Sequence, residues 1–145
     1  MQRILTILIV IFCLAGVFIS GMALGEHYNT KPSPCSINDR WDCGIVNHSP
    51  YAVVHFNASP YAALREFPVA LIGIVGYAVL IAFTGRYPRI TVLLALIALI
   101  FTLRLTWIEW RVLGVWCIYC VSSQIVIAIV FLLSLVAALL RRKHA

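Results

Sequence analysis

The sequence contains few charged residues, and acidic side chains are the scarcest among them. Only 11% of its 145 residues are Asp, Glu, Lys or Arg, and five are acidic, whereas soluble domains carry about 25% charged residues. Hydrophobic residues make up 63% of the chain, and the mean hydropathy is +1.00. This composition excludes a soluble globular fold, and the length permits one domain. We therefore expect an integral membrane protein.

The apolar residues are grouped in four runs, at residues 4–24, 68–84, 90–110 and 116–140. Most approach the roughly 20 residues that a helix needs to cross a hydrocarbon core of about 30 Å. The second run is the shortest, but without it the charged loops would fall on the wrong sides of the membrane. The first run exceeds the roughly 7–15 apolar residues of a signal peptide, so we expect it to be retained. The sequence predicts an all-α, four-helix transmembrane bundle in one domain, residues 1–145.

Basic and acidic residues separate to opposite ends of this predicted bundle. All five acidic residues fall at the end that carries the long polar loop of residues 25–67. The opposite end carries Arg3, Arg86, Arg89, Arg141, Arg142 and Lys143. Because loops rich in Lys and Arg stay in the cytoplasm, we predict that both termini are cytoplasmic. The long loop then faces the periplasm of a bacterial inner membrane, or the lumen in a eukaryotic cell.

Four of the five cysteines form two pairs on the predicted outer side. Cys35 and Cys43 form a C-x7-C pair, which seven intervening residues allow to close, in an exposed polar loop that other proteins can reach. Cys117 and Cys120 form a C-x-x-C pair at the first turn of the last run, where the helix dipole favours a thiolate and both sulfurs share one face. Alone, such a pair is also compatible with a structural disulfide or half a metal site. Cys13 lies in the first run, and we expect it to be a buried core residue.

Two thiol pairs on the oxidising side of a membrane indicate an electron relay. The loop pair would exchange disulfides with a soluble partner, and the helix pair would pass two electrons to an acceptor in the bilayer, for which a quinone is the obvious candidate. A four-cysteine zinc site is the weaker interpretation, because the C-x7-C pair lacks the usual short ligand spacing. A closed zinc site would also leave the apolar bundle without a purpose. We expect no metal.

Two further features lie in the outer loop and the third run. The tetrapeptide Ser-Pro-Tyr-Ala occurs at residues 49–52 and 59–62, and Ser before Pro is typical of a helix start, so we predict two short surface helices that form a lid. The residues predicted to anchor this lid are Tyr51, Val54, Phe56, Tyr61 and Leu64. Arg104 lies near the outer boundary, where its side chain can reach water. Glu109 lies five residues further on, off the i, i+4 face, so we predict no ion pair between them.

Four motifs, taken in order, resemble the vitamin K epoxide reductase family. They are the C-x7-C loop, the Ser-Pro-Tyr-Ala stretch, the segment FPVALIGIVGY at residues 67–77, and Trp-Cys-Ile-Tyr-Cys at residues 116–120. The resemblance covers nearly the whole chain, and bacterial members resemble it more than vertebrate ones do. It implies a four-helix bundle around a quinone and a thioredoxin-like, DsbA-like partner. The partner should be a separate protein, because the sequence contains no fused thioredoxin domain.

The resemblance also implies a role for each paired cysteine. Cys35 would exchange with the partner, Cys43 would form a transient bridge to Cys117, and Cys120 would face the quinone and donate electrons to it. The predicted function is therefore a membrane thiol-disulfide oxidoreductase that oxidises a DsbA-like protein. One alternative is a vitamin K quinone or epoxide reductase. An alternative of another class is a non-enzymatic membrane protein that is stapled by disulfides or binds metal.

We expect the electron acceptor, ubiquinone or menaquinone, to be bound by Gly73, Tyr77, Trp116, Tyr119 and Gln124. Gly73 belongs to a stripe of small residues that admits a neighbouring helix or a flat ring, and helix contact is the favoured interpretation. Vertebrate members place Asn and Tyr donors where this sequence has Val69 and Gln124. Gln124 retains a donor and Val69 does not.

Overall fold

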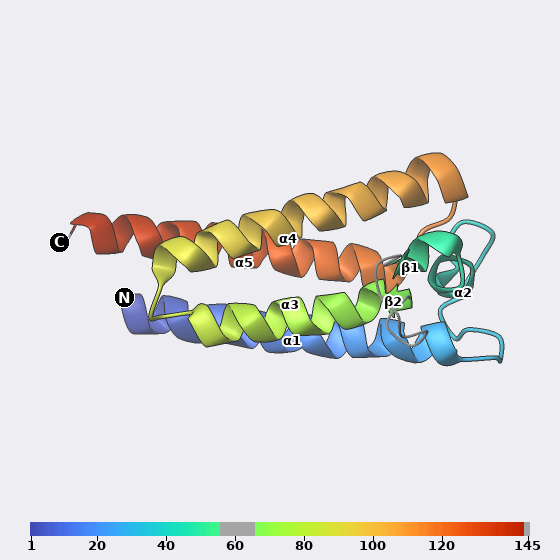
Figure 1. Cartoon of the computed structure of the whole chain (residues 1–145), viewed down its shortest axis with the longest axis horizontal. Helices are drawn as coiled ribbons and strands as arrows, with labels where there is room; N and C mark the ends of the chain where they lie inside the picture. Colours follow the sequence, from blue (N-terminus) through green and yellow to red (C-terminus); the bar gives the residue numbers. More distant parts are fainter. Residues whose placement is uncertain (56–65, 144–145) are drawn as a thin grey trace.

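The structure, a computed structural model, describes residues 1–55 and 66–143. Four long helices lie side by side along one axis in this part of the chain (Figure 1). They are α1 (Gln2–Tyr28), α3 (Val69–Phe83), α4 (Pro88–Ile108) and α5 (Ile118–Lys143). Helix α1 packs against α3 and α5, and α4 packs against α5. The start of α1 and the end of α5 lie at one end of this bundle, and the short elements lie at the other (Figure 1).

Three helical segments of the described chain are long and apolar enough to cross a membrane: Gln2–Tyr28, Pro88–Leu113 and Ile118–Arg142. The second combines α4 with a π-helical turn, η3 (Glu109–Leu113). Helix α3 has 15 residues and is about 22 Å long. It starts later than the predicted run at residue 68, because Phe67 and Pro68 belong to a strand.

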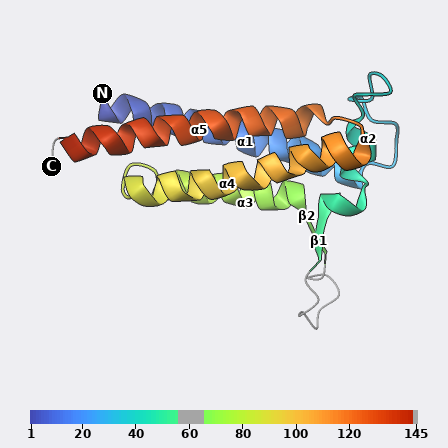
Figure 2. The same cartoon turned by 90° about the horizontal axis from the view of Figure 1, so that it is seen from above.

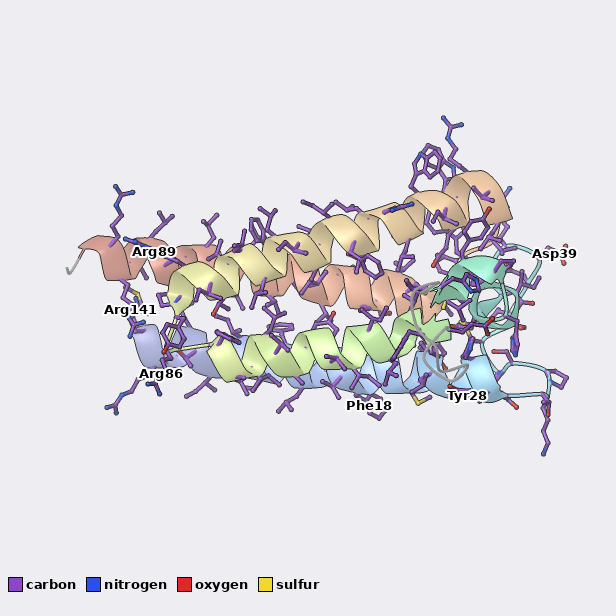
Figure 3. All side chains as sticks on the ribbon, viewed as in Figure 1. Phe18, Tyr28, Asp39, Arg86, Arg89 and Arg141 are labelled. Carbon is purple, nitrogen blue, oxygen red and sulfur yellow. A yellow bond between two sulfur atoms is a disulfide. The ribbon has the colours of Figure 1, made fainter. Side chains whose placement is uncertain are left out.

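Large apolar side chains cover the outside of the bundle. Phe18, for example, is 71% exposed and points away from the other helices (Figure 3). A surface so rich in hydrocarbon is unusual for a protein in water and normal for one in lipid. The three long apolar helices and this surface fit a membrane protein.

A single buried cluster connects the four long helices. It is formed by Ile9, Cys13, Tyr77, Leu80, Ala95, Val126, Ile127 and Val130. Cys13 is 0% exposed, which confirms the prediction that it is a core residue. Helices α1 and α3 approach closely here: a Cβ atom at Gly16 would overlap the ring of Tyr77, and one at Gly73 would lie 2.8 Å from Ser20 Oγ. The small residue at position 73 therefore serves helix contact, as the sequence predicted.

Short elements gather at the cysteine end of the bundle. They are α2 (Cys43–Asn47), the 3-10 turn η1 (Pro50–Ala52), and the antiparallel strands β1 (Val53–His55) and β2 (Glu66–Pro68). Asp42 caps α2, since its carboxylate accepts a hydrogen bond from Ile45 N at 3.0 Å. Figure 2 shows the two strands at the same end of the bundle as α2.

The predicted surface helix at residues 49–52 is only one 3-10 turn, and the chain then becomes a strand rather than a lid helix. The Ser49 side chain does not cap this turn; its Oγ donates to Val46 O at 2.8 Å. The β-branched residues Val53 and Val54 favour the strand, where Val54 pairs with Phe67. The second Ser-Pro-Tyr-Ala copy and the anchors Phe56, Tyr61 and Leu64 lie outside the described residues.

The contact between Gly16 and Tyr77 gives a test of bundle packing. We expect Gly16→Ala to lower the free energy of unfolding by about 1–3 kcal/mol, because the added methyl group must displace a buried ring. Gly21→Ala on the same helix is the control, since no described atom lies within 4 Å of a Cβ there. Thermal unfolding in detergent micelles measures the difference. Equal midpoints for the two variants would contradict the packing.

Candidate functional site

The structure brings the two cysteine pairs into one cluster at the end of the bundle opposite the chain termini. Cys35, Cys43 and Cys117 are buried there with Val46 and Val115, and Cys120 packs against them. Cys35 and Cys43 form a disulfide with a Cα–Cα distance of 5.5 Å, while Cys117 and Cys120 are free thiols. An oxidised pair therefore lies directly against a reduced pair, which is the arrangement that thiol–disulfide exchange requires.

The expectation of an exposed loop disulfide is wrong. Cys35 is 5% exposed and Cys43 is 0% exposed, because the loop folds back onto the start of α5. Val115, Leu113 and Ile118 supply the apolar surface that covers the pair. Cys35 is the slightly more exposed of the two disulfide-bonded residues.

Backbone hydrogen bonds hold the loop on this surface. Asp42 N donates to Trp116 O at 3.0 Å, and Trp116 N donates to Arg40 O at 2.7 Å. The rings of Trp41 and Trp116 lie 6.3 Å apart and are tilted by 37°. Trp116 thus connects the loop to the C-x-x-C segment.

Cys117 lies at the start of α5, where its environment favours the thiolate. Its carbonyl oxygen accepts a helical hydrogen bond from Val121 N at 3.0 Å, so Cys120 falls in the first turn. A hydrogen bond from the Cys120 thiol lowers the pKa of Cys117, and the backbone N–H groups of Cys120 and Tyr119 act in the same direction. These bonds outweigh the burial and the nearby negative charge of Glu109, which both raise the pKa of Cys117. Cys117 is therefore the better nucleophile of the two free thiols.

Asn47 is a site residue that the sequence analysis did not identify. Its Nδ2 donates to Cys43 O at 2.8 Å and to Cys117 Sγ at 3.6 Å, so a single buried carboxamide connects the two pairs. His27 Nδ1 lies 2.6 Å from the carbonyl oxygen of Asn47, which ties α2 to the end of α1. Asn47 follows Cys43 by four residues, a spacing that has meaning only once α2 is known to be helical.

Glu109 is the second unidentified site residue, and it is 2% exposed. Its Oε2 accepts a hydrogen bond from Cys117 N at 3.2 Å, and its carboxyl group is close enough to interact with the Cys120 side chain. Its Oε1 has no hydrogen-bond partner among the described residues. Arg104 is exposed and forms no ion pair with it, as predicted. An acidic residue inside an apolar run is itself a signal of function, and this signal could have identified Glu109 from the sequence.

An apolar cavity of about 420 Å³ reaches Cys120 and Glu109 from between the helices. Of the predicted quinone residues, Gly73, Tyr77 and Tyr119 line this cavity. The Tyr77 hydroxyl donates to Ser123 O at 2.9 Å, and this hydrogen bond connects α3 to α5.

The other two predicted quinone residues, Trp116 and Gln124, are not among the cavity-lining residues of the described chain. Trp116 packs against Trp41, and Gln124 Oε1 accepts a hydrogen bond from Thr106 Oγ1. Within residues 1–55 and 66–143, no three His, Cys, Asp or Glu side chains converge as metal ligands would.

The hydrogen bond from Asn47 to Cys117 gives a prediction about thiol chemistry. We expect Asn47→Ala to raise the pKa of Cys117, because the thiolate loses a buried hydrogen-bond donor. At a fixed pH the variant then has less thiolate. A pH titration of the ultraviolet absorbance of the thiolate measures the shift, with Asn29→Ala, which lies outside the cysteine cluster, as the control. An unchanged first titration step in Asn47→Ala would contradict the contact.

The comparisons with known proteins agree with this geometry. A model of the vitamin K epoxide reductase family matches residues 7–135, which covers most of the chain and all four paired cysteines. A search of curated proteins finds no match. Because the family model spans the bundle and the cysteine cluster together, the chain belongs to the vitamin K epoxide reductase family and is an oxidoreductase of membranes.

Proposed function

We propose that this protein oxidises thiols on the outer side of the membrane and passes the electrons to a quinone in the bilayer. The observation that supports this most is the junction of three features: a disulfide, a dithiol packed against it, and an apolar cavity that reaches the dithiol. A static staple needs no free thiols beside the disulfide, so this arrangement disfavours a non-enzymatic role.

The proposed cycle has three exchanges, each of which moves two electrons. A reduced, thioredoxin-like DsbA-type partner attacks the Cys35–Cys43 disulfide at Cys35 and leaves oxidised. Cys43 then attacks Cys117 in an oxidised Cys117–Cys120 pair, which restores the loop disulfide and leaves a dithiol in α5. Finally the Cys117–Cys120 dithiol closes to a disulfide as the quinone is reduced to quinol. The structure corresponds to the state before the last step.

The cavity fits a flat apolar ring. Its volume of about 420 Å³ falls within the range of about 300–1,000 Å³ for small-molecule sites. Cys120 and Tyr119 line it at the outer end, and Gly73 and Ser20 line it where α3 meets α1. The quinone supplies the two-electron redox chemistry, and the chain positions it beside Cys120. Ubiquinone and menaquinone share this ring chemistry.

The distribution of charge supports an outer-side location for the cysteines. Arg86, Arg89 and Arg141 lie at the end of the bundle that holds both ends of the chain, and Asp39 lies at the cysteine end (Figure 3). Positive charge marks the cytoplasmic side, so the proposed orientation places both termini in the cytoplasm. Helix α3 would be the fourth span, with the flanking residues completing its length. The proposed location is a bacterial inner membrane with the cysteines facing the periplasm.

Cysteine variants test the relay. We expect Cys117→Ala and Cys120→Ala to reduce quinone reduction to background, because neither can form the disulfide that releases two electrons. Cys35→Ala should block turnover with a protein substrate and spare small thiols such as dithiothreitol. The assay is anaerobic mixing with a reduced thioredoxin-like protein and a short-chain ubiquinone, followed by quinol absorbance. Cys13→Ala, a substitution in the helical core, should remain active; full activity of Cys120→Ala would refute the proposal.

Vitamin K epoxide reduction is the second candidate, since it would use the same dithiol and family membership favours it. The cavity offers little to hold an epoxide, because Val69 has no donor and the Gln124 carboxamide is held by Thr106. We expect the epoxide as sole acceptor to be reduced at least about tenfold more slowly than ubiquinone, the factor that corresponds to about 1.4 kcal/mol. Val69→Asn should narrow this gap. Equal rates in the unmodified protein would reverse the order of the two candidates.

A further inference from the structure

Glu109 is a buried acidic residue beside the C-x-x-C pair, and thiol–disulfide exchange by itself does not require a carboxyl group there. Its carboxyl group is 2% exposed, touches both Cys117 N and the Cys120 side chain, and lines the apolar cavity. One of its oxygens, Oε1, is buried without a hydrogen-bond partner in the described chain. A buried carboxyl oxygen without a partner costs about 1–3 kcal/mol or more, so its retention suggests a role in the reaction.

We propose that Glu109 is a catalytic residue that takes the thiol proton of Cys120 and delivers it to an oxygen of the quinone bound in the cavity. This inference rests on the proposed function. Glu109 connects the two required sites, because its Oε2 accepts from Cys117 N at the C-x-x-C pair and the residue lines the cavity, while Oε1 has no partner among the described residues. A carboxyl group suits the task because it can hold a proton and release it again.

The atoms and electrons balance. Closing the Cys117–Cys120 disulfide releases two electrons and two protons, and conversion of quinone to quinol consumes both. The proton of Cys120 passes to the Glu109 carboxylate and from the carboxylic acid to the quinone oxygen. Cys117, as a thiolate, has already lost its proton to water on the outer side. The second proton of the quinol comes from that water.

Two other polar side chains at the cavity are already hydrogen-bonded. The Tyr77 hydroxyl donates to Ser123 O, and His27 Nδ1 is paired with Asn47 O. Glu26 is a second buried acid with an oxygen lacking a partner among the described residues, but it is not a lining residue. Arg111 lies against the ring of Trp110 at 4.9 Å from its centroid rather than at the carboxylate. Glu109 is thus the lining carboxyl group in contact with a reactive thiol.

The helix geometry places Glu109 at this junction. Helix α4 ends at Ile108, and Glu109 begins the π-helical turn η3, an irregularity that often occurs at functional sites. The turn ends at Gly114, whose φ of 68° is in the left-handed region and whose N–H donates to Glu109 O at 2.9 Å. This closure brings Cys117, three residues later, back over the Glu109 side chain.

The test compares two buried acids. Glu109→Gln retains an oxygen that accepts from Cys117 N but cannot carry a proton. We expect single-turnover quinol formation from the dithiol protein to fall by about 10²–10³-fold, within the usual range for loss of an acid–base group. Glu26→Gln is the matched control and should change the rate less than twofold. Glu109→Asp, which retains a carboxyl group, should recover part of the rate.

A second measurement needs no quinone. Infrared difference spectra between the dithiol and diamide-oxidised states should contain a carboxyl band in the unmodified protein and in Glu26→Gln, and lack it in Glu109→Gln. A normal rate and an unchanged band in Glu109→Gln would overturn the inference while leaving the proposed function intact. Failure of the unmodified protein to reduce quinone would instead refute the proposed function. Even then, a carboxyl band that persists in Glu109→Gln would show that Glu109 is not the group that carries the proton.

Discussion

The site depends on two backbone hydrogen bonds between the outer loop and Trp116, the residue before the C-x-x-C pair. They seat Arg40–Asp42 on the segment that starts α5, and so bury Cys43 against Cys117. The other contacts of the site follow from this seating: the disulfide lies against the dithiol, Asn47 contacts both pairs, and the loop covers the cysteine end of the bundle. Without it, the two pairs would not be in contact.

The seating also accounts for the buried disulfide. In the proposed cycle a partner must reach the sulfur of Cys35, which is 5% exposed, so the loop has to move away from Trp116. The two backbone hydrogen bonds contribute about 0.5–1.5 kcal/mol each on a net basis, and opening must also expose the apolar contacts of the cysteine cluster. Closed, the same loop shields the Cys117 thiolate from water and from small oxidants. The loop therefore protects the thiolate when closed and gives access to Cys35 when open.

The parts of the fold that could be predicted from the sequence are those set by composition and spacing. Apolar runs became helices because a backbone in lipid must satisfy its own hydrogen bonds, and the burial of Cys13 followed from its place in such a run. The two cysteine spacings placed the pairs on a loop and at a helix start. The strand pairing of Val53–His55 with Glu66–Pro68 could not be predicted, because three-residue strands carry too little periodicity to distinguish from a surface turn.

The missed site residues share one physical reason. Asn47 and Glu109 contact Cys117 from positions 70 residues and eight residues away in the sequence, and neither distance is a helical spacing that would mark the contact. From the sequence, the only kind of partner that spacing can test for Glu109 is a nearby cation such as Arg104, because i, i+4 spacing identifies side-chain pairs. Its real partner is a backbone N–H presented by the turn at Gly114, and backbone donors are invisible to residue patterns. The partner of a single acidic residue at the end of an apolar run can therefore be a backbone N–H group as well as a basic side chain.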